Sequence, residues 1–103
     1  MAGATRIASV RTRSFLASFN ALPASIRNQA MQRYRNYFVL DPSHPLLERH
    51  HLHDVNDAQP DSFAVTIAFG YRAVGFFDDA ARRYVWYWCG SRAAYDQRFR
   101  AGR

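Results

Sequence analysis

A run of large side chains from Tyr84 to Cys89 constrains the fold more than any other part of the sequence. In an extended segment, successive side chains point to opposite faces. Alternation therefore predicts two bulky faces, one with Tyr84, Trp86 and Trp88 and the other with Val85, Tyr87 and Cys89. A strand that is bulky on both faces is typically central in a sheet and covered on both sides. Gly90-Ser91 would end this strand.

Helical periodicity dominates the first 40 residues. The spacing of Phe15, Leu16, Phe19 and Leu22 predicts a helix over 12–21. Leu22-Pro23 interrupts this pattern, and Pro is well tolerated in the first turn of a second helix, expected over 24–39. Asp41-Pro42 would end the second helix, because the residue before Pro is driven out of the helical region. We expect the two helices to form an antiparallel hairpin joined at Pro23.

The rest of the chain is patterned as strands separated by turns. We expect strands over 47–53, 62–67, 71–77 and 83–89, with a short edge strand near 7–10 and a closing helix over 92–100. With 103 residues the chain is long enough for one core and too short for two domains. We therefore predict a single α+β domain over 1–103, with the helices packed on one face of an antiparallel sheet.

The charge of the chain is lopsided. All 14 basic residues are Arg, against eight acidic residues, which gives a formal net charge of +6. Such an excess favours a polyanionic partner: nucleic acid, an anionic membrane or an acidic protein. No stretch approaches the roughly 20 apolar residues of a membrane span, and no secretory signal is recognisable, so we expect a cytoplasmic protein. The single Cys89 excludes an internal disulfide and is interpreted as a small buried hydrophobic residue.

Three histidines in four residues, His50, His51 and His53, form the first candidate site, flanked by Arg49. On a strand His51 and His53 share a face, and His50 points away. No third protein ligand is placed to complete a zinc site, so we expect no metal and no cofactor. Two interpretations stay open: a solvated polar edge strand, or imidazoles that act as acid, base or phosphate contact.

Two further segments combine Arg with Tyr. Tyr71-Arg72 follows the turn at Gly70, where Arg72 is either a surface charge or a phosphate clamp. Later, Arg92 and Tyr95 lie one helical turn apart after Gly90-Ser91 and share a side. There the guanidinium could hold a phosphate while the phenol stacks on a base or donates a proton.

Taken in order, these motifs resemble a known family. They are Phe15…Phe19…Leu22-Pro23; Asp41-Pro42-x-His44-Pro45-x-Leu47; Tyr71-Arg72-Ala73-Val74-Gly75; and Trp86-Tyr87-Trp88-Cys89-Gly90-Ser91-Arg92-x-x-Tyr95-Asp96. In this arrangement the chain resembles the RelE/ParE toxins of type II toxin–antitoxin systems, over about residues 13–98. The resemblance is greatest to a subgroup with His-Pro-x-Leu, Tyr-Arg-Ala and Trp-x-Trp-x-Gly-Ser-His-x-x-Tyr motifs.

The resemblance implies a helical hairpin on a curved antiparallel sheet with a short C-terminal helix. It implies a toxin held inactive by a cognate antitoxin. Members of the RelE branch cut mRNA in the ribosomal A site without metal, as metal-independent endoribonucleases. Transferred onto this sequence, the catalytic residues would be Arg72, Arg92, Tyr95, His51 and His53, and the RNA-binding residues would be Arg49 and His50.

This chain departs from the subgroup at two places. Ala64, Val65, Thr66 and Ile67 carry no charge where relatives often have a cation, and Arg92 replaces the usual His after Gly-Ser. Either the three-histidine segment supplies the acid–base group, or the protein is a non-enzymatic toxin: a ParE-like inhibitor of gyrase, or a degenerate copy that acts by protein binding. A small RNA-binding domain that is not a toxin is a third possibility.

Overall fold

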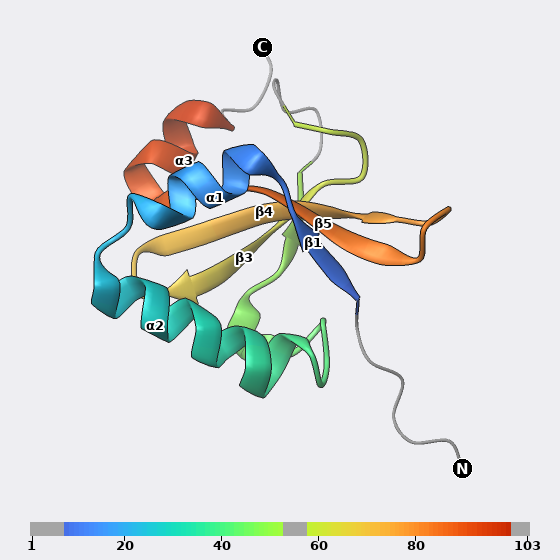
Figure 1. Ribbon diagram of the computed structural model, residues 1–103, viewed down its shortest axis with the longest axis horizontal. Coiled ribbons are helices and arrows are strands. Elements are labelled where there is room, and N and C mark those ends of the chain that lie inside the picture. Colours follow the sequence, from blue (N-terminus) through green and yellow to red (C-terminus); the bar gives the residue numbers. More distant parts are fainter. Residues whose placement is uncertain (1–7, 53–57, 100–103) are drawn as a thin grey trace.

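The computed structural model describes residues 8–52 and 58–99, and Figure 1 shows their arrangement. These residues form a five-stranded sheet in the order β1-β5-β4-β3-β2. The strands are β1 (Ser9–Arg11), β2 (His50–His51), β3 (Phe63–Ala68), β4 (Tyr71–Asp78) and β5 (Arg83–Ser91). The helices are α1 (Arg13–Asn20), α2 (Ala24–Arg33), the π-helical turn η1 (Tyr34–Phe38), the 3₁₀ turn η2 (Pro45–Leu47) and α3 (Arg92–Arg98).

Both N-terminal helices form where the sequence predicts them, and both lie on one face of the sheet. The Thr12 hydroxyl caps α1 by accepting from the Phe15 amide at 3.1 Å. After Pro23, α2 continues through η1, so the chain stays helical to Phe38. The antiparallel hairpin that we expected is not exactly formed, because α1 packs mainly against β5, whereas α2 packs mainly against β3. Figure 1 shows α1 and α2 diverging across the sheet.

The sheet is antiparallel from β2 to β5, as predicted, but β1 joins its edge as a parallel neighbour of β5. The prediction of a strand over 47–53 is largely wrong. Pro45 starts the 3₁₀ turn, the His44 ring Nδ1 accepts from the Leu46 amide, and Glu48 takes a left-handed conformation with φ of 51°. Of the described residues 47–52, only His50–His51 form a strand. His53 lies outside the described residues.

A β-bulge in β5 overturns the simple alternation expected for that strand. Val74 pairs with Trp88 and Gly75 with Trp86, so Tyr87 is an extra residue between them. As a result Trp86 and Cys89 belong to the core beneath the N-terminal helices, whereas Tyr87 and Trp88 pack against the core on the other face. The prediction that Trp86 and Trp88 share a face is therefore wrong. β5 is nevertheless central and covered on both sides, as its composition predicts.

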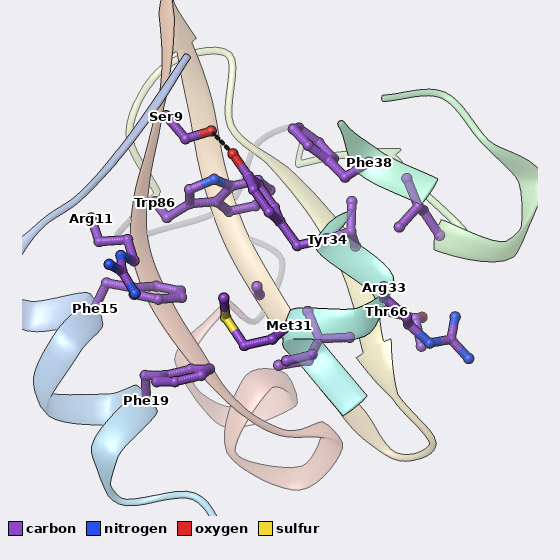
Figure 2. A pocket seen from close by; sticks show the side chains of 15 residues that line it. Ser9, Arg11, Phe15, Phe19, Met31, Arg33, Tyr34, Phe38, Thr66 and Trp86 are labelled. Atoms are coloured by element: carbon purple, nitrogen blue, oxygen red, sulfur yellow. Dashed lines mark hydrogen bonds between the residues drawn. The ribbon is translucent and has the colours of Figure 1, made fainter. Parts of the chain in front are cut away.

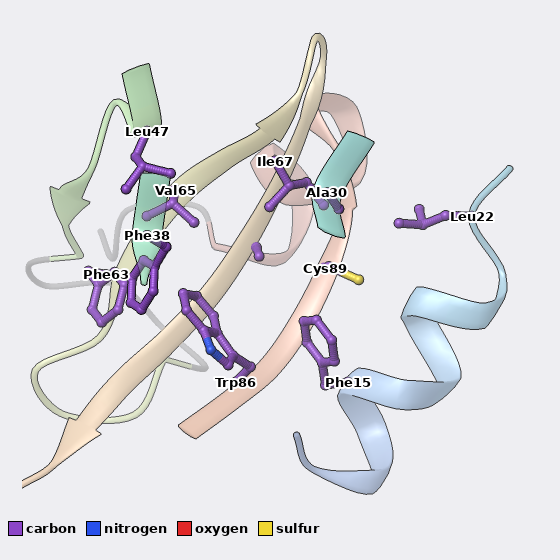
Figure 3. Close-up of a cluster of buried hydrophobic side chains, with 11 residues drawn as sticks. Phe15, Leu22, Ala30, Phe38, Leu47, Phe63, Val65, Ile67, Trp86 and Cys89 are labelled. Carbon is purple, nitrogen blue, oxygen red and sulfur yellow. The ribbon is translucent and has the colours of Figure 1, made fainter. Parts of the chain in front are cut away.

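The larger core lies between the N-terminal helices and the sheet, and its buried side chains are drawn in Figure 3. Phe38, 1% exposed, stands at its centre. Its ring packs edge-on against Tyr84 and Trp86, with centroids 4.9 and 5.1 Å away, and stacks on Tyr34 at 5.5 Å. α3 covers the opposite face, where Tyr95 and Phe99 pack against Ala64 and Val74.

A cavity of about 280 Å³ opens where the two N-terminal helices diverge. Figure 2 shows Phe15 and Phe19 of α1 facing Met31 of α2 across it. The Tyr34 hydroxyl donates to Ser9 Oγ at 2.6 Å beside the cavity. Trp86 lines the wall, and its buried Nε1 has no hydrogen-bond partner within the described part of the chain.

Cys89 is buried and its thiol is not activated. Burial raises the pKa of the Cys89 thiol, and the hydrogen bond with Ser18 opposes this effect without cancelling it. A raised pKa lowers the fraction of reactive thiolate at neutral pH. This environment agrees with the interpretation of Cys89 as a small hydrophobic residue. In the part of the chain that is described, no helix is long and apolar enough to cross a membrane.

Candidate functional site

The face of the sheet under α3 brings together three side chains that the sequence singled out. His50 comes from β2, Arg72 from β4 and Tyr95 from α3. His50 Nε2 lies 3.0 Å from the Tyr95 hydroxyl oxygen, and the Arg72 guanidinium carbon lies 5.1 Å from the centre of the Tyr95 ring. We call His50, Arg72 and Tyr95 the central triad.

Local structure holds Tyr95 in place. Ser91 caps α3, its hydroxyl accepting from the Ala94 amide at 3.2 Å, so the helix begins directly where β5 ends. Tyr95 is one turn into α3 and only 7% exposed. Its ring contacts those of Trp88 and Phe99, with centroids 6.2 and 5.5 Å away. The bulge in β5 is needed for this packing, because it turns Trp88 toward α3.

His50 is oriented from both sides of its ring. Nδ1 lies 3.4 Å from the Glu48 carbonyl oxygen, which can only accept a hydrogen bond. The tautomer that satisfies this contact carries its proton on Nδ1. Nε2 is then free to accept from the Tyr95 hydroxyl. The two contacts make a chain from phenol to imidazole to backbone carbonyl.

Tyr95 holds its proton more tightly than an ordinary tyrosine. Burial raises the pKa of the Tyr95 phenol, and nearby Arg72 partly offsets this effect. Asp96 also raises the pKa of Tyr95, whereas Arg92 lowers it. The net direction is upward, so the phenol remains a hydrogen-bond donor at neutral pH.

This pKa shift predicts how stability changes in alkali. The folded protein keeps the Tyr95 proton at a pH where the unfolded chain, with a tyrosine pKa of about 10, has lost it. Folding stability should therefore fall as pH rises above about 10, because the folded state binds more protons. Tyr95→Phe removes this contribution. Urea unfolding at pH 9 and pH 11 measures it, and an equal fall in both proteins would contradict the assignment.

The other predicted residues lie outside the central triad. Arg92 is exposed at the start of α3 and pairs with Asp96 at 3.4 Å. It influences the pKa of Tyr95 but lies at the rim of the site. His51 pairs with Phe63, a residue of the core beneath the N-terminal helices, whereas His50 pairs with Ala64 on the α3 side. Cross-strand partners share a face, so His51 points away from the triad.

Arg49 packs against aromatic side chains of the core on the helix side. Its guanidinium carbon lies 4.0 Å from the centre of the Phe63 ring and 5.9 Å from that of Tyr84. The same guanidinium donates to the Pro42 carbonyl oxygen at 3.3 Å. Phe63 and Tyr84 belong to the core on the helix side. Arg49 therefore fastens the loop before β2 to that core, on the opposite face from the triad.

Sequence reasoning missed one acidic neighbour of the site. The Thr66 hydroxyl donates to Glu48 Oε1 at 2.8 Å, and Thr66 is the cross-strand partner of Arg72. Glu48 thus contributes its backbone carbonyl to His50 and its carboxylate to Thr66. Glu48 reaches this position through a left-handed backbone conformation, which cannot be recognised from the sequence. Across residues 8–52 and 58–99, no group of three His, Cys, Asp or Glu side chains could hold a metal ion.

Comparison with known proteins identifies the fold. No family model and no curated protein sequence matches the chain. Among solved structures, it is similar to the RelBE2 toxin–antitoxin complex of Mycobacterium tuberculosis, with a TM-score of 0.59 and 14% identity over 85% of this chain and 100% of that one. It is also similar to the archaeal RelE–RelB complex from Pyrococcus horikoshii, with a TM-score of 0.61 and 11% identity over 84% and 94%.

A third similar structure is a copper-bound mutant toxin from Helicobacter pylori, with a TM-score of 0.56 and 18% identity over 85% and 97% of the two chains. All three similarities span nearly the whole of the matched chains. The chain therefore has an α+β fold of the RelE toxin type. This result confirms, at the level of the fold, the resemblance found in the sequence.

Proposed function

We propose that the protein is the toxin of a type II toxin–antitoxin system and that it cleaves mRNA on the ribosome in the cytoplasm. The observation that carries this proposal is the hydrogen bond between His50 and Tyr95 beside Arg72, on the α3 face of a RelE-type fold. An acid–base pair next to a fixed guanidinium is suited to phosphodiester chemistry. The net charge of +6 suits a nucleic-acid substrate.

In the proposed reaction the ribose 2′-hydroxyl attacks the adjacent phosphorus, and the bond from phosphorus to the 5′-oxygen breaks. Tyr95 accepts the 2′-hydroxyl proton while it passes its own proton to His50 Nε2. The Arg72 guanidinium stabilises the charge that builds on the phosphate. The leaving 5′-oxygen takes a proton from solvent. The products are a 2′,3′-cyclic phosphate and a 5′-hydroxyl end, and no cofactor takes part.

These roles differ from those that the sequence suggested. His50 takes the acid–base role first given to His51 and His53, because His50 Nε2 lies 3.0 Å from the Tyr95 hydroxyl oxygen. Arg92 becomes a rim residue that attracts the RNA backbone. The cognate antitoxin remains the expected protein partner, and two of the similar structures are toxin–antitoxin complexes. An acidic antitoxin would complement the Arg excess.

A non-enzymatic toxin is the second candidate. It is favoured by the uncharged site-facing residues Ala64 and Thr66 of β3, where a cation would help to bind a phosphate. Such a protein would arrest growth by binding gyrase or another protein. Inducing the chain in cells and mapping RNA 5′ ends separates the candidates. A nuclease creates new 5′-hydroxyl ends within coding regions, whereas growth arrest without new ends would favour the second candidate.

Tyr95→Phe provides a sharp test of the acid–base pair. The change keeps the ring that packs on Trp88 and Phe99 and removes only the hydroxyl. General acid–base catalysis contributes about 10²–10⁴-fold, so we expect RNA cleavage to fall at least a hundredfold. Stability should change by no more than about 1 kcal/mol. Cleavage on purified ribosomes and urea unfolding measure the two effects, and undiminished cleavage would remove Tyr95 from the mechanism.

A further inference from the structure

One aromatic side chain near the candidate site is almost completely in solvent. Phe69 is 93% exposed, more than any other large hydrophobic residue described. It occupies the first position of the two-residue turn between β3 and β4, since Ala68 pairs with Tyr71. In Figure 1 the turn between β3 and β4 is on the left side of the view, below α3.

The fold does not explain an aromatic residue at this position. Gly70 supplies the left-handed backbone that the turn needs, with φ of 78°. The first turn position accepts many residues, and Pro or small polar residues are the usual choices. A side chain as exposed as that of Phe69 stabilises the folded state very little by burial. The folded protein would therefore tolerate a small residue there.

The surroundings of Phe69 are cationic. The Arg92 amide donates to the Gly70 carbonyl oxygen at 2.8 Å, which fixes the turn against the start of α3. Arg92 is exposed, and Arg72 is the second residue of β4, two residues after Gly70. Within residues 8–52 and 58–99, the other exposed large hydrophobic residues lie outside this turn: Leu16, Leu40, Leu46 and Phe77. A single exposed aromatic ring on a turn that is bonded to the start of α3 does not form the continuous apolar patch of a protein-docking surface.

We propose that Phe69 stacks on an unpaired base of the RNA that Arg72 and Arg92 hold by its phosphates. This inference rests on the proposed function and names a base-recognition residue for the same site. Stacking on exposed aromatic rings beside basic groups is how many proteins bind single-stranded nucleic acid. The ring needs solvent exposure to meet a base, which accounts for its position at the tip of a turn. Phe69 lies outside the central triad and has no role in bond breaking.

The test compares Phe69→Ala and Phe69→Tyr with Phe77→Ala. Phe77 is a matched control because it is a partly exposed Phe one residue before the end of β4. Figure 1 shows the β4–β5 turn on the side of the molecule away from α3. The probe is a short fluorescein-labelled single-stranded RNA, with binding followed by anisotropy. We expect Phe69→Ala to weaken binding about tenfold, and Phe69→Tyr and Phe77→Ala to leave it within about twofold. Cleavage at saturating ribosome-bound mRNA should keep its rate in Phe69→Ala.

Each outcome bears on a defined part of the proposal. RNA binding that is unchanged in Phe69→Ala, while Arg72→Ala lowers cleavage about a hundredfold or more, overturns the stacking role and leaves the nuclease proposal intact. A loss of cleavage rate at saturation in Phe69→Ala also overturns it, because a stacking residue acts on binding. If the unaltered protein neither binds nor cleaves RNA, the proposed function itself fails, and the inference fails with it.

Discussion

Arg72→Ala is expected to lower RNA cleavage on ribosomes about a hundredfold or more. The guanidinium of Arg72 lies over Tyr95 and is the only cation in the central triad. Removing one group that stabilises transition-state charge typically costs about 2.7–4 kcal/mol, which corresponds to a factor of about 10²–10³. The variant should still fold, because Arg72 is outside both buried clusters.

Arg82→Ala is the matched control for that variant. Arg82 lies 3.4 Å from Asp79 in an exposed ion pair at the turn between β4 and β5. Exposed pairs contribute about 0–1 kcal/mol, so this change should leave both cleavage and stability nearly unaltered. Combining Arg72→Ala with Tyr95→Phe should cost less than the product of the single effects, because groups that act on one phosphate are not additive. Full toxicity in the double variant would contradict the nuclease proposal.

Phe38→Ala is expected to destabilise the fold by about 3–5 kcal/mol, the range observed for loss of a buried Phe side chain. Phe38 contacts Tyr34, Phe63, Tyr84 and Trp86, so its removal would leave a large hole at the centre of the core. A small domain has about 5–15 kcal/mol of total stability, and the loss would be a large part of it.

Leu40→Ala, only two residues along the chain, serves as the comparison. Leu40 is 77% exposed, and surface changes of this kind usually stay within about 0.5 kcal/mol. Urea unfolding of the two variants measures the difference. A Phe38→Ala protein as stable as Leu40→Ala would show that the core is not built around this ring.

The sequence predicts those parts of the fold that depend on local signals. Leu22-Pro23 marks the boundary between α1 and α2, and the turn at Gly70 directly precedes β4. The bulky run before Cys89 predicts a central strand. Each of these features depends on neighbouring residues alone, such as a proline that interrupts a helix or a glycine that can adopt positive φ.

The failures depend on contacts that are distant in the sequence. Tyr87 is inserted in β5 by pairing with β4, so alternation alone cannot show that Trp86 and Trp88 face opposite sides. Similarly, the short β2 takes its register from β3, and this register decides that His50, and not His51, faces Tyr95. The stacking of Arg49 on Phe63 is likewise a contact between distant parts of the sequence, and the sequence alone did not show it.

For the candidate site, the residue types were easier to predict than their roles. Arg72 and Tyr95 were both named from the sequence, and both lie in the central triad. Arg92 was named with them, yet its guanidinium pairs with Asp96 in solvent. The helical spacing of Arg92 and Tyr95 is compatible with a shared side. However, α3 rests on the sheet so that Tyr95 is buried and Arg92 stays at the rim.

The most direct test of the central claim is to incubate the purified protein with ribosomes that carry a defined mRNA and to analyse the RNA ends. The proposed mechanism predicts cuts within the ribosome-bound segment that leave 5′-hydroxyl and 2′,3′-cyclic phosphate ends. These cuts should be about a hundredfold or more weaker in both Arg72→Ala and Tyr95→Phe. The claim would be contradicted if the mRNA stays intact with the unaltered protein although the same protein arrests growth when it is expressed in cells. That result would favour a toxin that acts by binding.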